Sequence, residues 1–206
     1  DSIGGGICQT SSTIYLATLL ANLEIVERYA HRYAPSYITM GMDATVSWGG
    51  PEFRFKNNTG YPIRIDVSYA NSEITVSIYG TKTDDTYVKM TREVLSSTGY
   101  ETEYVETEEL PWGTQKQKQS GYTGYEVKSY RNIYDGDGNL ISSTLEATSS
   151  YKSRNEIILV GIAGRPETED PGDTTDPGST DPGSTETGGT VDPGADPDTE
   201  PPGWLN

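Results

Sequence analysis

The sequence predicts an α+β fold: one helix packed on antiparallel strands, then an elongated all-β module and a disordered tail. Three observations predict it. Residues 10–23 have helical periodicity, with Ile14, Ala17 and Ala21 on one stripe and no Gly or Pro inside. Short alternating runs bounded by turn residues follow as far as residue 161. From residue 167 onwards Asp, Pro, Gly, Ser and Thr dominate, and such a segment offers almost no apolar surface to bury.

The expected organisation has four parts. Residues 1–80 form the helix-containing domain, 81–99 a polar connection with some strand character, 100–165 the β module and 166–206 the tail. A loop over residues 1–9 precedes the helix, whose N-terminus Thr10, Ser11 or Ser12 is expected to cap. The expected strands are 24–32, 44–48, 53–56, 63–67 and 74–79, then 101–105, 114–120, 124–134, 140–151 and 156–160.

The charge is concentrated in the tail. The chain has 15 basic and 31 acidic residues and a net charge of -16, of which eleven acidic residues and no basic ones fall between residues 167 and 206. The other 166 residues carry a net charge of -5, which is ordinary for a soluble domain. Nucleic-acid binding needs clustered Lys and Arg, so the composition argues against it.

Cysteine and histidine are scarce. With one of each, Cys8 and His31, the chain can form no internal disulfide and no Cys/His zinc cluster, so no metal or cofactor is expected. No stretch of about 18 apolar residues predicts a membrane span. The abrupt start at Asp1, without an initiator Met, is interpreted as a fragment whose upstream part carries any export signal.

The sharpest chemical feature is a glycine run followed by the only thiol. Glycines allow a tight turn and close approach to main-chain N–H groups, and Cys8 comes just before the predicted helix. The helix dipole there favours a thiolate, and the same N–H groups suit an oxyanion, as covalent acyl transfer requires. The only imidazole, His31, is the candidate base, with Asp43 further along the chain. The alternative is that Cys8 is a small buried apolar residue and His31 is structural.

The first part of the chain resembles the VanW domain family. The motifs that carry the resemblance are GGGICQ at residues 4–9, LEIVER at 23–28, His31, MDATV at 42–46, FRFKNNT at 53–59, YPI at 61–63 and IYG at 78–80. The family takes its name from vancomycin-resistance gene clusters, and some members are reported to be L,D-transpeptidases with the motif cysteine as nucleophile. The resemblance therefore implies that Cys8 is the nucleophile, His31 the base and Asp43 an orienting carboxylate. Gly5, Gly6, Gln9 and Thr10 would form the oxyanion and substrate loop.

Residues 88–161 resemble the G-five domain family of extracellular, wall-associated proteins. The matching motifs are EYV at 103–105, LPWG at 110–113, GYTG at 121–124, YDG at 134–136 and NEIILVG at 155–161. The resemblance implies binding to polymers that contain N-acetylglucosamine, or a spacer role. The rings of Tyr122, Tyr125 and Tyr130 are the candidates for stacking on sugars. The alternative is that these tyrosines only pack across strands.

Together these features predict a secreted protein of the bacterial cell wall or cell surface. The favoured function is L,D-transpeptidase-like acyl transfer on peptidoglycan stem peptides through Cys8, with a module that binds glycan strands or acts as a spacer. A non-enzymatic wall-binding or adhesion protein remains an alternative, as does a peptidoglycan hydrolase that uses the same Cys–His pair.

Overall fold

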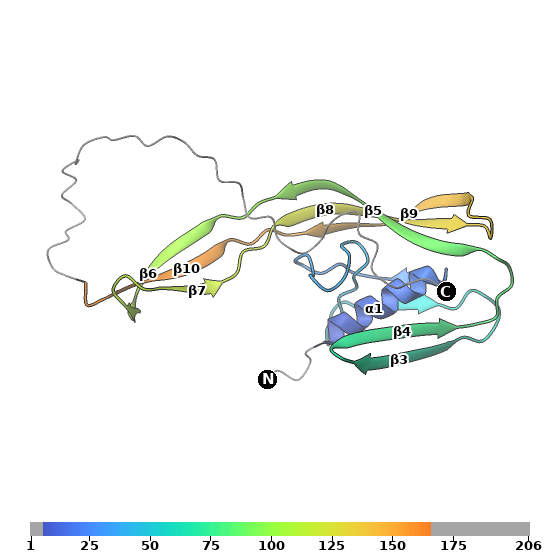
Figure 1. Cartoon of the computed structure of the whole chain (residues 1–206), viewed down its shortest axis with the longest axis horizontal. Coiled ribbons are helices and arrows are strands. Elements are labelled where there is room, and N and C mark those ends of the chain that lie inside the picture. Colours follow the sequence, from blue (N-terminus) through green and yellow to red (C-terminus); the bar gives the residue numbers. More distant parts are fainter. Residues whose placement is uncertain (1–5, 166–206) are drawn as a thin grey trace. The chain divides into compact units, whose positions relative to one another are not determined.

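The structure is a computed structural model that describes residues 6–165, shown in Figure 1. Within this range there is one helix, and ten strands follow it. The predicted disordered tail, residues 166–206, lies outside the described residues. No helix in the described range is both long and apolar enough to cross a membrane.

Helix α1 spans Ile7–Leu20 and begins earlier than predicted. Its N-cap is Gly6, which has a φ of 89° and makes no side-chain cap, so the prediction of a cap at Thr10, Ser11 or Ser12 is wrong. Glycine adopts this left-handed conformation without a Cβ penalty, which lets the glycine run turn directly into the helix. Cys8 is therefore inside the first turn of α1 instead of in a loop before it.

The buried face of α1 is also not the predicted one. Its buried residues are Ser11, Ser12, Tyr15, Thr18 and Leu19, and the predicted stripe is only partly buried. Burial of hydroxyls on this face is possible because each donates to a nearby carbonyl oxygen: Ser12 to Cys8 and Thr18 to Ile14. Periodicity of apolar residues alone therefore selected the wrong side of the helix.

The core around α1 is small and draws on distant segments. Tyr15, Leu19 and Ala44 form its buried centre, and Ile25, Phe53 and Met90 pack against it. The rings of Tyr15 and Phe53 meet edge to face with centroids 5.4 Å apart. The helix packs against β1, β4 and β5.

Two small antiparallel pairs accompany the helix. β1 (Glu24–Glu27) pairs with β2 (Arg54–Lys56), and β3 (Arg64–Ala70) forms a hairpin with β4 (Glu73–Tyr79), beside α1 in Figure 1. β1 ends five residues before the predicted strand does, so His31 lies in a loop. The predicted strand 44–48 does not form. The carbonyl oxygen of Ala44 instead accepts hydrogen bonds from Ser11 and Ser12 of α1.

A second, three-stranded sheet has the order β5-β8-β9, all antiparallel. β8 (Gly124–Tyr134) and β9 (Leu140–Tyr151) have the predicted bounds, because turn residues mark their ends. The turn between them is held by the Asp135 carboxylate, which accepts N–H bonds from Asp137 and Asn139. β5 (Tyr87–Thr98) is a twelve-residue strand where a polar connection was expected. Most of its side chains are exposed, so the alternation that reveals a strand is weak.

A third sheet has the order β6-β10-β7, from β6 (Thr102–Pro111), β7 (Gln115–Gln119) and β10 (Glu156–Ala163). The backbone approaches closely at Gly161, where a Cβ would collide with the carbonyl oxygens of Leu110 and Pro111. Only glycine fits there.

The chain divides into two compact units, each made of segments that are distant in the sequence. One consists of Asp1–Glu103 with Gln119–Ile157, and the other of Tyr104–Lys118 with the chain from Ile158 onwards. The first unit thus contains α1, β1–β5, β8 and β9 together. The region expected to connect two domains is a strand of this unit, and strands from both sides of it share one compact body.

Candidate functional site

The thiol of Cys8 is half-buried at the start of α1. Its Sγ lies 3.4 Å from the carbonyl oxygen of Val46 and 3.6 Å from Oγ1 of Thr45. The first hydrogen bond of the helix runs from the N–H of Thr10 to the carbonyl of Gly6. The N–H groups of the three residues before Thr10 therefore have no carbonyl within the helix to bond, and they face the end where the thiol lies.

The imidazole of His31 is held by Asp43. Nδ1 of His31 lies 2.7 Å from Oδ2 of Asp43, and the backbone N–H of His31 donates to the same oxygen at 2.8 Å. The Asp43 side chain is fully buried, whereas the His31 side chain is 18% exposed. Two bonds from one residue to one oxygen fix both the position of the loop and the orientation of the ring.

The remaining partners of Asp43 saturate the carboxylate. The guanidinium of Arg28 donates from Nη2 to Oδ1 at 2.8 Å and from Nε to the backbone carbonyl of Asp43 at 2.5 Å. The hydroxyl of Tyr151, in β9, donates to Oδ1. Arg28 is almost fully buried, with 6% of its side chain exposed, so this is an interior ion pair with hydrogen bonds on every side.

These contacts keep Asp43 ionised. Burial raises the pKa of its carboxyl, but the hydrogen bond with His31, the charge of Arg28 and the hydroxyl of Tyr151 outweigh burial, and the net pKa lies below the ordinary value. The negative charge of Asp43 beside Nδ1 keeps a proton on that nitrogen. Nε2 is then the ring nitrogen that can exchange protons with the rest of the site.

The pKa values of His31 and Cys8 shift in opposite directions. The hydrogen bond with Asp43 is the main cause that raises the pKa of His31; burial opposes it, and the contact with Cys8 adds to it. Burial raises the pKa of the Cys8 thiol, but its interactions with Val46, Thr45 and His31 outweigh burial and lower the pKa. Both shifts favour a thiolate beside an imidazolium.

Tyr37 is a further member of the site that sequence reasoning missed. Its hydroxyl lies 3.1 Å from Nε2 of His31, and the two rings meet edge to face with centroids 6.1 Å apart. The ring is 43% exposed, so it stands at the border between the site and solvent. Burial is the main cause that raises the pKa of Tyr37, and the charge of Cys8 adds to it.

Comparison with known proteins agrees with the two resemblances. Residues 1–79 match the family of VanW-like proteins, and residues 88–163 match the G5 domain. The two matches follow one another in the order that the sequence predicted. The uncharacterised protein YoaR of Bacillus subtilis (strain 168) is 46% identical to it over 79 residues, which are 38% of this chain and 26% of YoaR. The match thus spans about a quarter of that relative's length. Together the two domains support a cell-wall-associated protein in general.

Two solved structures resemble part of the chain. The structure of the IgA1 protease G5 domain is 21% identical to the matched part of this chain. The match covers 39% of this chain and 96% of the IgA1 protease chain, with a TM-score of 0.26. The crystal structure of HP0197-G5 is also 21% identical. That match covers 37% of this chain and 97% of the HP0197-G5 chain, with a TM-score of 0.20. TM-scores this low leave the architecture to be argued from the chain itself.

The predicted oxyanion and substrate loop is only partly placed. Gly5 lies outside the described residues, and Gly6 is the helix cap. Thr10 is engaged in the first helical turn, where its hydroxyl donates to the carbonyl of Gly6 at 3.1 Å. The Gln9 side chain is partly buried in that turn. The helix start, more than a flexible loop, supplies the N–H groups near Cys8.

The three tyrosines predicted for glycan binding do not form one platform. Tyr122 stacks on Tyr33 with ring centroids 5.1 Å apart, and the guanidinium of Arg154 lies 4.5 Å from the Tyr122 centroid. Tyr125 and Tyr130 are five positions apart on β8, and the alternation of a strand places them on opposite faces. The hydroxyl of Tyr130 donates to Glu93.

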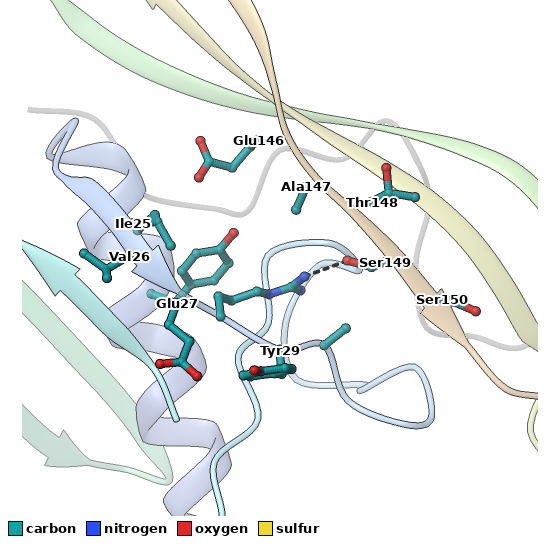
Figure 2. Close-up of a pocket in the computed structure, with 12 residues that line it drawn as sticks. Ile25, Val26, Glu27, Tyr29, Glu146, Ala147, Thr148, Ser149 and Ser150 are labelled. Carbon is teal, nitrogen blue, oxygen red and sulfur yellow. Dashed lines mark hydrogen bonds between the residues drawn. The ribbon is translucent and has the colours of Figure 1, made fainter. Parts of the chain in front are cut away.

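A cavity of about 390 Å³ lies beside the site in the first unit, and Cys8, His31 and Asp43 do not line it. Figure 2 shows its two walls: one carries Ile25, Val26, Glu27 and Tyr29, and the other is the β9 segment Glu146–Ser150. The dashed line in Figure 2 is the bond from Nη1 of Arg28 to Oγ of Ser149, 2.8 Å long. Arg28 thus lines this cavity and also holds Asp43.

Arg28, Tyr37, Ser149 and Tyr151 are the site residues that sequence reasoning did not find. Arg28 closes the LEIVER motif, which is the one signal that pointed near it. Nothing in the sequence marks Tyr151 or Ser149, because both act on a residue more than a hundred positions away.

Proposed function

We propose that this chain belongs to a wall-associated enzyme that transfers acyl groups between peptidoglycan stem peptides, in the manner of an L,D-transpeptidase. Cys8 is the nucleophile, His31 the general base and acid, and Asp43 the carboxylate that orients the imidazole. The observation that carries the proposal is the fully buried Asp43 bonded to Nδ1 of His31, in a site whose charges favour a Cys8 thiolate.

The first half of the reaction forms a thioester. The Cys8 thiolate attacks the carbonyl carbon of an amide in a stem peptide, a C–S bond forms, and the carbonyl oxygen takes the negative charge. The C–N bond then breaks, and the leaving amine takes a proton from Nε2 of His31. Asp43 stabilises the imidazolium before this transfer and keeps Nδ1 protonated throughout.

The second half regenerates the thiolate. The amine of a second stem peptide attacks the thioester carbon and gives its proton to Nε2 of His31, and the C–S bond breaks as the new amide forms. The N–H groups at the start of α1 supply donors for the oxyanion in both halves. Tyr37, beside Nε2 and open to solvent, lies where the two amines must enter and leave.

Two other functions use the same residues differently. A hydrolase would let water resolve the thioester, and the same Cys8–His31 pair would serve. A non-enzymatic wall-binding or adhesion protein would need no thiolate at all. The imidazole held at Nδ1 by buried Asp43, together with the lowered pKa of Cys8 and the raised pKa of His31, favours the enzymatic alternatives, because a structural cysteine needs no oriented imidazole.

The test is acyl transfer between two stem peptides, one of which carries a labelled amine, with the products identified by mass spectrometry. The wild-type chain should yield the cross-linked peptide and should be acylated by a carbapenem on Cys8. Cys8→Ala should lose both, and His31→Gln should slow transfer by about a hundredfold or more. Hydrolysed peptide without cross-link would select the hydrolase, and transfer by Cys8→Ala would overturn the proposal.

We further propose that the G5 domain contacts wall glycan, with Tyr122, Tyr125 and Tyr130 as the predicted ring contacts. The general association of G5 domains with carbohydrates supports this. Since Tyr125 and Tyr130 lie on opposite faces of β8, these two rings would contact a glycan separately. Retention of the chain on purified peptidoglycan, compared with a Tyr122→Ala variant, measures it; equal retention would leave the spacer role.

A further inference from the structure

We propose that Tyr151, a residue of the G5 domain, is a positioning residue for the Asp43–His31 pair, so that strand β9 completes a site which the VanW-like region begins. The proposal rests on the proposed function, because a positioning role has meaning only if Cys8 and His31 react. Family boundaries assign the site to residues 1–79, whereas Tyr151 lies well inside the matched G5 residues.

The hydroxyl of Tyr151 connects two points of the loop that carries Asp43. It accepts a hydrogen bond from the backbone N–H of Gly41 at 2.7 Å and donates to Oδ1 of Asp43. Its side chain is almost fully buried, with 3% exposed. One hydroxyl thus fixes the backbone two residues before Asp43 and one of the two oxygens of its carboxylate.

The other oxygen of the carboxylate is the one that holds His31. A carboxylate bonded at Oδ1 cannot rotate about its Cβ–Cγ bond without losing the Oδ1 contacts. Fixing Oδ1 therefore fixes the direction in which Oδ2 meets Nδ1 of the imidazole. Tyr151 acts on the ring through Asp43 and does not touch it.

Strand β9 supplies a second contact that points the same way. Ser149, two residues earlier, accepts a hydrogen bond from Nη1 of Arg28, whose Nη2 donates to Oδ1 of Asp43. Figure 2 shows Ser149 on the β9 wall, where the dashed line marks its hydrogen bond with Arg28. Both Oδ1 donors, Tyr151 and Arg28, are therefore held from β9.

The packing of the sheet supports the same conclusion. Met90 of β5 packs on the core around α1, and Arg131 of β8 donates to the carbonyl of Leu23, just after that helix. The backbone N–H of Lys152 donates to the carbonyl of Arg32, next to His31. Met90 of β5 and Arg131 of β8 thus contact the core of α1 and the chain just after the helix, and Lys152, directly after β9, holds the loop beside His31, all within one compact unit.

The test uses the single thiol of the chain. Because Cys8 is the only cysteine, iodoacetamide labelling of the full chain reports its thiolate alone. The groups that set its pH profile are His31, Asp43 and Arg28, with Tyr37 beside the imidazole and Tyr151 behind the carboxylate. Labelling rates are measured across pH for the wild type, Tyr151→Phe, Ser149→Ala and Tyr134→Phe. The last removes a hydroxyl from the same sheet outside the site.

Tyr151→Phe should lower the labelling rate at mildly acidic pH about fivefold and move the midpoint of the profile upwards, towards an ordinary cysteine. Ser149→Ala should move it the same way by less, and Tyr134→Phe should leave it unchanged. A residue with a merely structural role would lower the melting temperature without moving the midpoint.

The outcomes separate this inference from the proposed function. A wild-type profile like that of an ordinary cysteine would sink the proposed function itself. A low wild-type midpoint that neither Tyr151→Phe nor Ser149→Ala moves would overturn the positioning role alone. Should Tyr151→Phe fail to fold, Ser149→Ala carries the test, and its unchanged midpoint counts against the inference.

Discussion

At the scale of single residues, Asp43 carries more contacts than any other group of the site. It accepts bonds from His31, Arg28 and Tyr151, and its side chain is fully buried. A buried ion pair of this kind costs desolvation, which its hydrogen bonds must offset. If Asp43 is removed, the buried charge of Arg28 loses its partner and destabilises the fold. Asp43 therefore contributes both to the stability of the fold and to the chemistry of the site.

Asp43→Asn should therefore lower the free energy of unfolding by about 3 kcal/mol, because Arg28 loses its counter-charge in the interior. Asp66→Asn is the matched control. Its partner Arg64 lies 3.1 Å away with both side chains more than half exposed, so the expected loss is below about 1 kcal/mol. Urea unfolding of both variants measures the difference, and equal losses would contradict the account.

The pKa of Asp43 also predicts how stability depends on pH. Its folded-state pKa lies below the unfolded value, near 3.8, so the carboxylate contributes stability above that value. This contribution is lost as the pH falls through the folded-state pKa. Thermal unfolding between about pH 5 and pH 2 should show a steeper decline for the wild type than for Asp43→Asn. Parallel curves would show that Asp43 is not held ionised.

At the scale of elements, the start of α1 decides where the thiol lies. Gly6 adopts a left-handed conformation, so the helix begins at Ile7 and Cys8 enters its first turn. The sequence indicated a helix and a glycine run, but not that the two join directly. Cap preferences favoured the hydroxyl residues at 10–12, yet those hydroxyls bond carbonyls of the helix and of residue 44. Such partners come from the tertiary fold and leave no mark in local sequence.

Gly6→Ala tests this start. A Cβ at Gly6 meets nothing within 4 Å, so the cost comes only from the backbone conformation, about 1 kcal/mol of folding free energy. The labelling rate of Cys8 should fall as well, because the first turn frays. Gly99→Ala is the control, since its surroundings are equally open and its φ is ordinary. A Gly6→Ala variant as stable and as reactive as Gly99→Ala would refute the helix start described here.

At the scale of the whole molecule, the two compact units do not coincide with the residue ranges that match the two families. Strands β8 and β9 were predictable to the residue, because turn residues bound them. The contact of β9 with Asp43 was not predictable, since the Tyr151–Asp43 bond joins residues 108 positions apart. Cys8, His31 and Asp43 could be singled out by residue type and motif, whereas the residues that hold them required the fold. The polar β5 was missed because most of its side chains face solvent.

Substitutions at two glycines, one in each compact unit, test which unit affects the reactivity of Cys8. A Cβ at Gly124 would lie 2.9 Å from the carbonyl oxygen of Tyr151, so Gly124→Ala should displace β9 and slow Cys8 labelling several-fold. Gly161→Ala would collide with backbone in the other unit and should leave labelling unchanged while it weakens β10. Hydrogen exchange checks that each variant loosens its own sheet. Slower labelling in Gly161→Ala and normal labelling in Gly124→Ala would reverse the assignment.

The pairing of Cys8 with His31 is tested most directly by the titration of the imidazole. His31 is the only histidine, so its ring resonances can be followed by NMR without assignment of the other residues. In the wild type its pKa should lie above the ordinary value of 6.5, and in Cys8→Ala it should fall, because the contact with Cys8 is one of the causes that raise it. A histidine that titrates at or below 6.5 in the wild type, or identically in both proteins, would contradict the thiolate–imidazolium pair.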